Sequence, residues 1–143
     1  MPPESSQTAA SGPSPETRVA LAMAELGALA TEGDATGFEV GAAMLAARLD
    51  DPSLTWAFVR GIRAQVRELE LTANMKACDM ALRDAFAYPK ARRMAQRIVA
   101  VSTARFYLRR AAMLGASEDF LRAAERTIAC ALMTDGLWLG AAA

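Results

Sequence analysis

The chain has 143 residues, of which 53% are hydrophobic and 22% charged, and this composition is too apolar and too weakly charged for a disordered protein. It contains no histidine, which excludes most zinc and haem sites, di-iron bundles of the Glu-x-x-His type, and serine or cysteine catalytic triads. Strong helix formers, chiefly alanine and leucine, supply much of the sequence. We therefore expect a single all-α domain that is not an enzyme and binds no metal or cofactor.

The first 14 residues combine three prolines with Ser, Thr, Gln and Gly, and no large apolar residue follows Met1. Such a segment cannot contribute to a core, so we expect a flexible tail at 1–14 and a helical domain at 15–143. The segment has no basic residue and no apolar run, so it does not match a secretory signal. No apolar run reaches the 18 residues or so that a membrane span needs. These features predict a soluble, cytoplasmic protein without membrane contact.

Two helices are predicted in the acidic N-terminal part. Ser14 and Pro15 suit a cap and a first helical position, which predicts a helix over 15–31 that ends near Gly33. Asp34 precedes a second apolar pattern, which stops at the Asp50-Asp51-Pro52 break. The predicted inward residues of the two helices are Val19, Met23, Leu26, Leu29, Phe38, Ala42, Leu45 and Leu49.

The third predicted helix, over 52–86, is expected to be capped at Asp51-Pro52 and has the clearest period. Its inward residues are spaced by three or four: Phe58, Ile62, Val66, Leu69, Ala73, Ala77 and Met80. Tyr88-Pro89 interrupts the helical pattern, since the residue before a proline resists helical geometry. A fourth helix is expected over 90–113, with Met94, Ile98, Val101, Leu108 and Ala112 inward. Cys78 and Cys130 both fall in apolar helical stretches, which predicts buried thiols.

Gly115 and Ser117 predict the end of the fourth helix and the cap of a fifth, which continues to about residue 142. Over 120–142 this helix is apolar on two sides: Leu121, Ala124, Ile128, Leu132 and Leu139 form one, and Cys130, Met133, Leu137 and Gly140 the other. A helix of this kind must be covered twice, and the simplest second cover is another copy of the chain. We therefore expect a homodimer through residues 118–141, with part of 90–113 as a second element, and its interface residues are Ile128, Leu132, Met133, Leu137 and Trp138.

The charges are unevenly divided between the two parts of the sequence. Residues 1–51 hold eight acids and two bases, a net charge of −6, and residues 52–143 hold fourteen bases and eight acids, a net charge of +6. Such asymmetry indicates either that the two parts face each other or that one meets an outside partner. The basic stretch 83–110 allows the same two interpretations. Its bases scatter around a helix, which favours pairing with the acidic part of the chain over contact with nucleic acid or an acidic partner. These bases are Arg83, Lys90, Arg92, Arg93, Arg97, Arg105, Arg109 and Arg110.

Eight methionines in an alanine-rich sequence indicate either simple filling of the core or a lipophilic pocket between helices. If there is a pocket for a small apolar ligand, we expect it between the third and fourth helices. The residues predicted to line it are Phe58, Ile62, Met80 and Met94.

The terminal stretch AAERTIACALMTDGLWLGAAA, with Asp135, Gly136, Leu137, Trp138 and Leu139 at its centre, resembles a helix near the end of TetR-type transcriptional regulators. The stretch GAAMLAARLDDPSLTWAFVRGIRAQVREL resembles that family's regulatory domain more weakly. The resemblance implies an all-helical effector-binding and dimerisation domain, in which the C-terminal helix helps to build a four-helix interface between two subunits.

The DNA-binding module of such regulators is not evident in this sequence. No short helix with a polar reading face forms a helix-turn-helix, so we expect no direct DNA binding by this chain. The resemblance thus predicts a non-enzymatic regulatory domain that dimerises and binds a small apolar effector. The alternative is a helical scaffold that engages an acidic protein through its basic fourth helix.

Overall fold

A computed structural model describes residues 12–87 and 94–134. All regular secondary structure in the described residues is helical and none of it is strand, which confirms the all-α prediction. The five helices are α1 (Pro15–Glu32), α2 (Ala35–Arg48), α3 (Trp56–Ala87), α4 (Met94–Met113) and α5 (Glu118–Thr134). The predicted tail up to residue 11, the Tyr88-Pro89 break and the predicted extension of the last helix to 142 lie outside the described residues. No described helix combines the length and the apolar composition that crossing a membrane requires.

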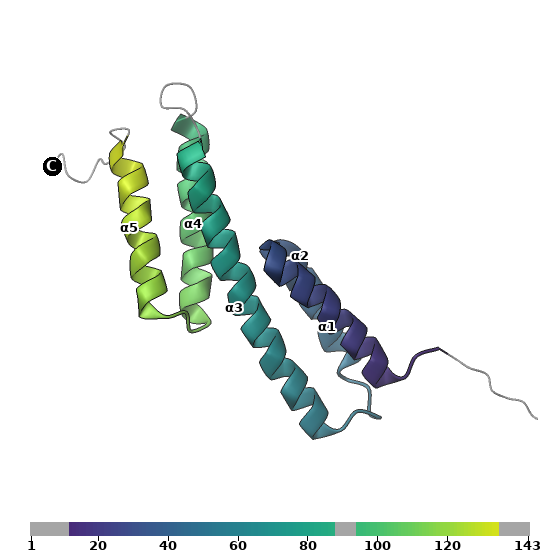
Figure 1. Cartoon of the computed structure of the whole chain (residues 1–143). Coiled ribbons are helices and arrows are strands. Elements are labelled where there is room, and N and C mark those ends of the chain that lie inside the picture. Colours follow the sequence, from purple (N-terminus) through teal and green to yellow (C-terminus); the bar gives the residue numbers. More distant parts are fainter. Residues whose placement is uncertain (1–11, 88–93, 135–143) are drawn as a thin grey trace, which may run out of the picture.

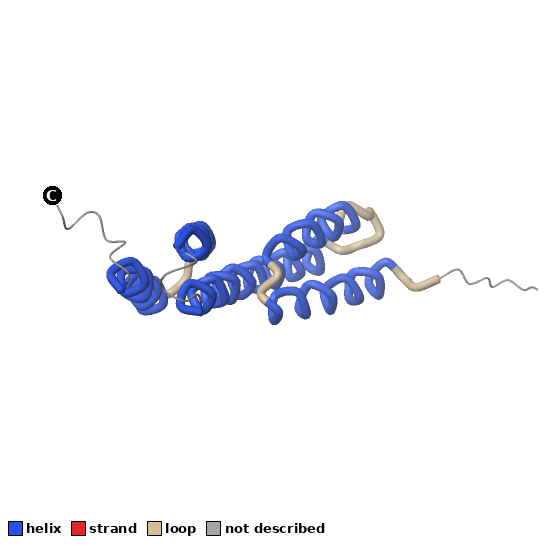
Figure 2. Tube along the Cα trace, turned by 90° about the horizontal axis from the view of Figure 1, so that it is seen from above, coloured by secondary structure: helices blue, strands red, loops and turns tan. Residues whose placement is uncertain are grey.

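The α3 helix is the spine of the molecule (Figure 1). It has 32 residues, which corresponds to about 48 Å of helix. The α1 and α2 helices pack against its N-terminal part, while α4 and α5 pack against its C-terminal part. Seen from above, α3, α4 and α5 form a triangle at one end, and α1 and α2 lie beyond it (Figure 2). The fold is therefore an elongated pair of helical units that share one helix.

Each unit has its own hydrophobic core cluster. The lower cluster joins α1, α2 and α3 through buried residues that include Val19, Leu26, Phe38, Leu45, Ala73 and Ala77. The upper cluster joins α3, α4 and α5 through Cys78, Leu82, Ala104, Leu108, Ala124 and Ile128, among others. The half-buried Tyr107 of α4 packs against both clusters. Tyr107 thus connects the two cores.

Local chemistry sets most helix ends. The Ser14 hydroxyl accepts a hydrogen bond from the Thr17 amide at 3.2 Å, and Pro15 occupies the first turn, as predicted. Gly33 ends α1 with φ of 76°, a left-handed conformation that glycine adopts without strain. Gly115 has φ of 95° after α4. The predicted ends at both glycines are confirmed.

The start of α3 differs from the prediction. The Asp51-Pro52 pair was expected to cap it, but the Asp51 carboxylate accepts from the Ser53 amide at 2.8 Å and hydroxyl at 2.7 Å. These two hydrogen bonds close a local turn and lower the pKa of Asp51. The Thr55 hydroxyl then caps the helix by accepting from the Phe58 amide at 3.2 Å, so α3 begins four residues later than predicted, at Trp56.

The inward faces of α3 and α4 also differ from the prediction. Ala73 and Ala77 are buried as expected, but Met80 is exposed, and the buried stripe passes instead to Asn74, Cys78, Ala81, Leu82 and Ala85. On α4, Val101 and Leu108 are buried, whereas Met94, Ile98 and Ala112 are exposed. The reason is that α3 is covered by two helix pairs on two different sides, so one continuous stripe cannot serve both.

Replacing Gly33 with alanine should lower the free energy of unfolding by about 1 to 2 kcal/mol, the cost of a left-handed non-glycine residue. A Cβ there would also come within 2.7 Å of the Met80 sulfur and 2.8 Å of Lys76 Cγ. Gly115→Ala is the matched control, because its φ is also positive but no atom lies within 4 Å of the added Cβ. Urea unfolding should show a larger loss of unfolding free energy for Gly33→Ala than for Gly115→Ala. An equal loss would mean that the Met80 and Lys76 side chains move aside without cost.

The two cysteines differ in exposure. Cys78 is fully buried, as predicted, whereas Cys130 is exposed, so the prediction for Cys130 is wrong. Burial raises the pKa of the Cys78 thiol to about 11. Because the thiolate is the reactive form, Ellman's reagent at pH 8 should not modify Cys78 in native protein, and Cys130→Ser should abolish native labelling. Both thiols should react in guanidinium. Rapid native labelling of the Cys130→Ser variant would contradict the burial of Cys78.

Candidate interaction surface

The described part of α5 separates the residues predicted to form a dimer interface. Ile128 is only 4% exposed and belongs to the upper core cluster, and Leu132 packs against that cluster. Met133 is 63% exposed. Leu137 and Trp138 lie outside the described residues. Of the predicted set, Met133 alone is therefore both described and on an open surface.

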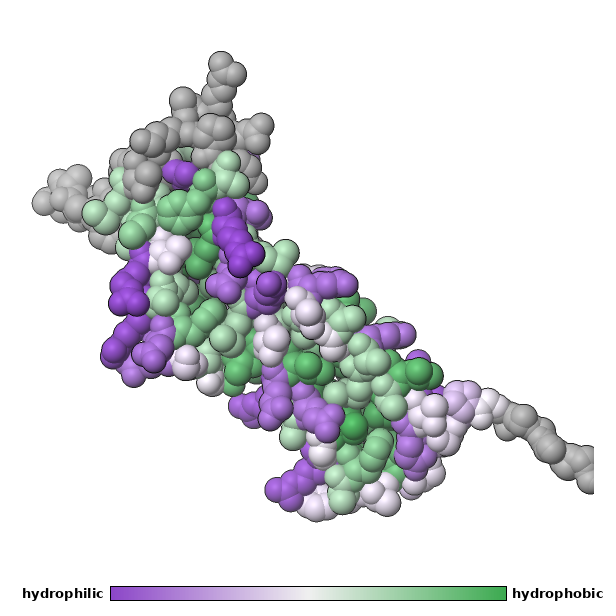
Figure 3. Space-filling model, viewed as in Figure 1, coloured by the Kyte–Doolittle hydropathy of each residue, from purple (hydrophilic) through white to green (hydrophobic). Residues whose placement is uncertain are grey.

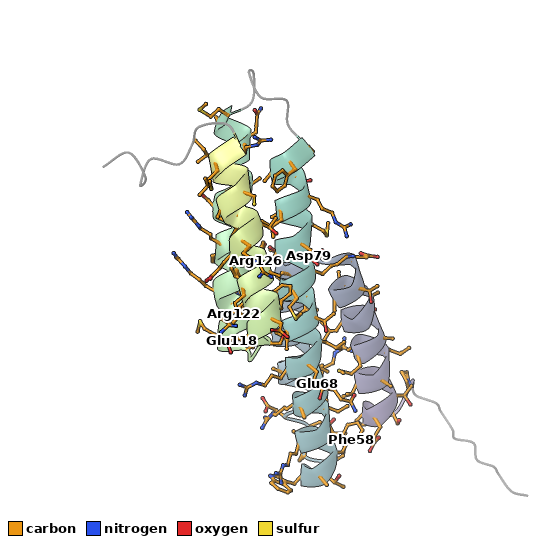
Figure 4. The ribbon with its side chains drawn as sticks, turned by 60° about the vertical axis from the view of Figure 1, so that its left-hand side comes forward. Phe58, Glu68, Asp79, Glu118, Arg122 and Arg126 are labelled. Atoms are coloured by element: carbon orange, nitrogen blue, oxygen red, sulfur yellow. The ribbon has the colours of Figure 1, made fainter. Side chains whose placement is uncertain are left out.

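The outer side of α5 is charged over most of its length. Its exposed residues include Glu118, Asp119, Arg122, Glu125 and Arg126, and Arg122 forms an ion pair with Glu118 at 2.5 Å. Figure 4 shows the labelled members along α5, and Figure 3 shows hydrophilic residues at its outer edge with hydrophobic ones between α5 and α3. The predicted second apolar side is therefore limited, among the described residues, to the last turns around Cys130 and Met133.

A larger open apolar surface belongs to α4. Met94, Ile98, Val99 and Phe106 are 48%, 47%, 64% and 54% exposed, and we call these four residues the α4 surface. The helix contains no acidic residue, and the only charge between positions 94 and 104 is that of Arg97, which is buried. Exposed large apolar side chains grouped on one helix mark an interaction site more often than chance exposure does.

The small residues of α4 explain why its larger ones stay outside. Ala100, Ala104 and Ala111 are all buried on the inward side, and the first two belong to the upper cluster. Arg97 fixes the rotation of the helix, because its Nε donates a hydrogen bond of 2.5 Å to the carbonyl of Ala85 in the last turn of α3. A cation there also complements the negative end of the α3 dipole. Ile98 and Val99 are consequently held facing outward.

Aromatic and charged contacts border the α4 surface. The rings of Phe106 and Tyr107 meet edge to face at 5.2 Å, and the Arg110 guanidinium lies 5.7 Å from the centre of the Phe106 ring. Arg110 pairs with Glu39 of α2 at 3.2 Å and lies 3.6 Å from Glu70 of α3. The Arg110–Glu39 pair joins the basic and acidic parts of the chain, as expected if these two parts face each other in the fold.

The basic stretch 83–110 is only partly open to a partner. Arg97 is buried and Arg110 is engaged with Glu39, while Arg83, Arg105 and Arg109 are exposed. Lys90, Arg92 and Arg93 lie outside the described residues. The exposed arginines of α4 therefore reduce to Arg105 and Arg109 among the described positions.

The four residues predicted to line a pocket are not brought together. Phe58 and Ile62 pack partly buried against the lower cluster, and Figure 4 shows Phe58 near the far end of α3. Met80 lies over Gly33, and Met94 begins α4. Phe58 and Met80 are separated along one helix by about 33 Å. Other residues, among them Leu82, Ala85, Ala100 and Val101, are buried between α3 and α4, so the predicted set does not form a common pocket.

An open groove lies instead between α4 and α5, with a volume of about 390 Å³. Its floor is apolar and its edges are charged. The lining residues are Arg105, Leu108, Arg109, Ala112, Leu121, Glu125, Ile128 and Ala129.

No family model, curated protein or solved structure matches this chain.

The sequence predicts part of 90–113 at the dimer contact but assigns Met94 and Ile98 to the inward side of that helix, although a signal for the exposed α4 surface is present. Eleven residues from Met94 to Ala104 contain one charge, at Arg97, and a solvated helix face would carry more. The pattern predicts Met94 and Ile98 on the inward side because they are larger than the alanines that face α3 in the structure. The buried position of Arg97 shows that the side of α4 with Arg97 faces inward and that Met94 and Ile98 face outward.

Proposed function

We propose that this chain is a non-enzymatic helical regulatory domain that forms a homodimer through the α4 surface together with Met133 of α5. This is the kind of assembly that the TetR resemblance implies. The observation that carries the proposal is the group of large apolar side chains that α4 holds outward: Met94, Ile98, Val99 and Phe106.

A second copy of the chain is the occupant that fits this surface best. A helix of 20 residues is about 30 Å long, so two copies of α4 can pack side by side over several turns. Between positions 94 and 104 the outward side of α4 has no like charges to repel its copy. Met94 begins α4 and Met133 lies in the last turn of α5. Because the two helices are antiparallel (Figure 1), both residues are at the same end of the pair, where α5 adds to the proposed contact. Two such pairs make a four-helix interface.

The groove between α4 and α5 is the proposed effector site. Its volume of about 390 Å³ falls within the range of small-molecule sites, and Leu108, Leu121 and Ile128 supply apolar walls. Arg105 and Arg109 stand opposite Glu125 and give a polar group of the effector something to contact. A ligand here would lie between the two helices that form the dimer, so binding and dimerisation would be coupled.

The direct test is the mass of the protein in solution. Light scattering after size exclusion should give twice the chain mass of 15.2 kDa at micromolar concentration, with dissociation on dilution. A mass of one chain at all concentrations would reject the dimer. For the effector, a panel of lipophilic carboxylates and amines should include compounds that raise the melting temperature, and Leu121→Arg should remove that rise.

The second candidate function, a scaffold that binds an acidic protein through α4, draws support from Arg105 and Arg109, which are exposed. The two functions predict different salt responses. An apolar dimer should persist at 1 M salt, while a complex formed by exposed charges should weaken steeply.

A further inference from the structure

The lower part of α3 carries an exposed aromatic and basic stripe. Trp56, Arg60, Arg63 and Arg67 stand at positions i, i+4, i+7 and i+11, which places them along one side of the helix. All four are exposed, and Trp56 is 74% exposed. The Arg60 guanidinium lies 5.2 Å from the centre of the Trp56 ring. We call these residues the Trp–Arg surface.

Higher up the helix, the same side is covered. Continuing the stripe by whole helical turns leads to Asn74, Cys78, Ala81 and Ala85, all of which are buried. Cys78, Ala81 and Ala85 belong to the upper cluster with α4 and α5. The α4–α5 turn lies well above the lower end of α3 (Figure 1), so these helices do not reach the end at which Trp56 begins α3.

The α1–α2 pair does not cover the Trp–Arg surface either. Its contacts with the lower part of α3 go through Phe58, Ile62, Val66 and Leu69, which lie on a different side of the helix. The side of α3 that contacts α4 in the C-terminal part of the helix is therefore open in the N-terminal part.

Small residues flank the Trp–Arg surface. Ala57, Gly61 and Ala64 are all exposed and lie next to the arginines at the same helical spacing. A Cβ built on Gly61 would meet no atom within 4 Å, so the space beside it is open. Another helix can approach α3 closely at these positions, because no bulky side chain holds it away.

We propose that the Trp–Arg surface binds an acidic amphipathic helix of a partner protein, which lies along α3 in the direction that α4 follows above. Arg60, Arg63 and Arg67 rise by about 4.5 and 6 Å along the axis, the spacing of carboxylates at three- and four-residue intervals on a facing helix. An apolar residue at the end of the partner helix would cover Trp56, and aromatic and arginine side chains are typical anchors of such interfaces.

A helix of a protein fits this surface better than nucleic acid does. The chain has a net charge of zero and an isoelectric point of about 6.3, whereas nucleic-acid-binding domains are strongly basic. The described basic side chains of the stripe number three, all on one helix, which matches a short run of carboxylates. This inference does not depend on the proposed dimer, because the Trp–Arg surface and the α4 surface belong to different helices.

The test uses Trp56 as its own reporter. The sequence has two tryptophans, so Trp138→Phe leaves Trp56 as the single tryptophan, whose emission can be excited selectively over that of the two tyrosines. The probe is a synthetic 18-residue helical peptide with Glu at positions i, i+3, i+7, i+10 and i+14, Leu beside them, and an otherwise alanine and glutamine sequence. Two further probes are the same peptide with Lys for Glu, and an 18-nucleotide oligothymidine.

We expect the Glu peptide to shift the Trp56 emission to shorter wavelength in a saturable titration, and the Lys peptide to leave it unchanged. Arg60→Gln, Arg63→Gln and Arg67→Gln together should weaken binding at least about tenfold, since each loses a charge-assisted contact. The matched control removes the same charge elsewhere, with Arg83→Gln, Arg122→Gln and Arg126→Gln, and should change the affinity less than about twofold.

Equal losses for the two triple variants would overturn the proposal, because they would indicate a response to net charge alone. Saturable binding of oligothymidine in preference to the Glu peptide would overturn it in favour of nucleic acid. Absence of any Trp56 response to the Glu peptide would reject the surface as a docking site. Circular dichroism of both triple variants should match the parent, since all six arginines are exposed.

Discussion

Replacing Val99 and Phe106 together with glutamate should convert the proposed dimer into a monomer. Both side chains are more than half exposed in the single chain, so the change should leave the fold intact. In a dimer, four carboxylates would be brought into an apolar contact, and burying unpaired charges there costs several kcal/mol. We expect sedimentation equilibrium to show at least about a hundredfold weaker association, with an unchanged helical signal in circular dichroism.

The matched control for this experiment is Leu21→Glu on α1. Leu21 is 58% exposed, close to the values of Val99 and Phe106, but it lies on the other helical unit. The control should dimerise like the parent chain. A dimer that survives the double change would place the interface elsewhere, and the open apolar residues Val40 and Met44 of α2 would then be the next positions to test.

Phe38→Ala should lower the free energy of unfolding by about 3 to 5 kcal/mol, as expected for removal of a large aromatic from a packed core. Phe38 is 1% exposed and is the largest fully buried side chain in the described part of the chain. It lies in the lower cluster, which α1, α2 and α3 share. Urea unfolding followed by circular dichroism measures the loss.

Val40→Ala is the control in the same helix. Val40 is 58% exposed, so its truncation should change the stability by less than about 0.5 kcal/mol. The shape of the transition carries further information, because the two core clusters meet at Tyr107 and along α3. A single transition for Phe38→Ala would indicate that the units unfold together. A loss smaller than about 1 kcal/mol would contradict the packing of Phe38 in the lower cluster.

The helices and their ends follow from short-range chemistry, which is why they could be predicted. Ser14, Gly33 and Gly115 act on backbone groups within one turn of themselves, so their effect needs no knowledge of the rest of the fold. The start of α3 differs from the prediction because two possible caps lie within five residues of each other. Asp51 bonds to Ser53, and Thr55 then takes the capping position.

The candidate sites depend on which side of each helix is covered, and neighbouring residues do not decide that. The sequence alone predicts that Arg97 is a solvated charge. In the structure its hydrogen bond to the Ala85 carbonyl orients α4 so that Ile98 and Val99 face outward. The spacing of Trp56, Arg60, Arg63 and Arg67 is visible in the sequence. Their exposure is not, because it depends on where α4 ends relative to α3.

The sequence by itself determined the five helices, most of the caps at their ends and the buried state of residues such as Phe38 and Leu45, because periodicity and capping are properties of a single helix. Only the tertiary structure decided that α3 serves two cores, that the small residues of α4 face inward, and that the outer side of α5 is charged over most of its described length. The physical reason is that an alanine-rich helix has several sides of similar apolarity. Contacts between helices, such as Arg97 with Ala85 and Arg110 with Glu39, determine which of these sides is buried.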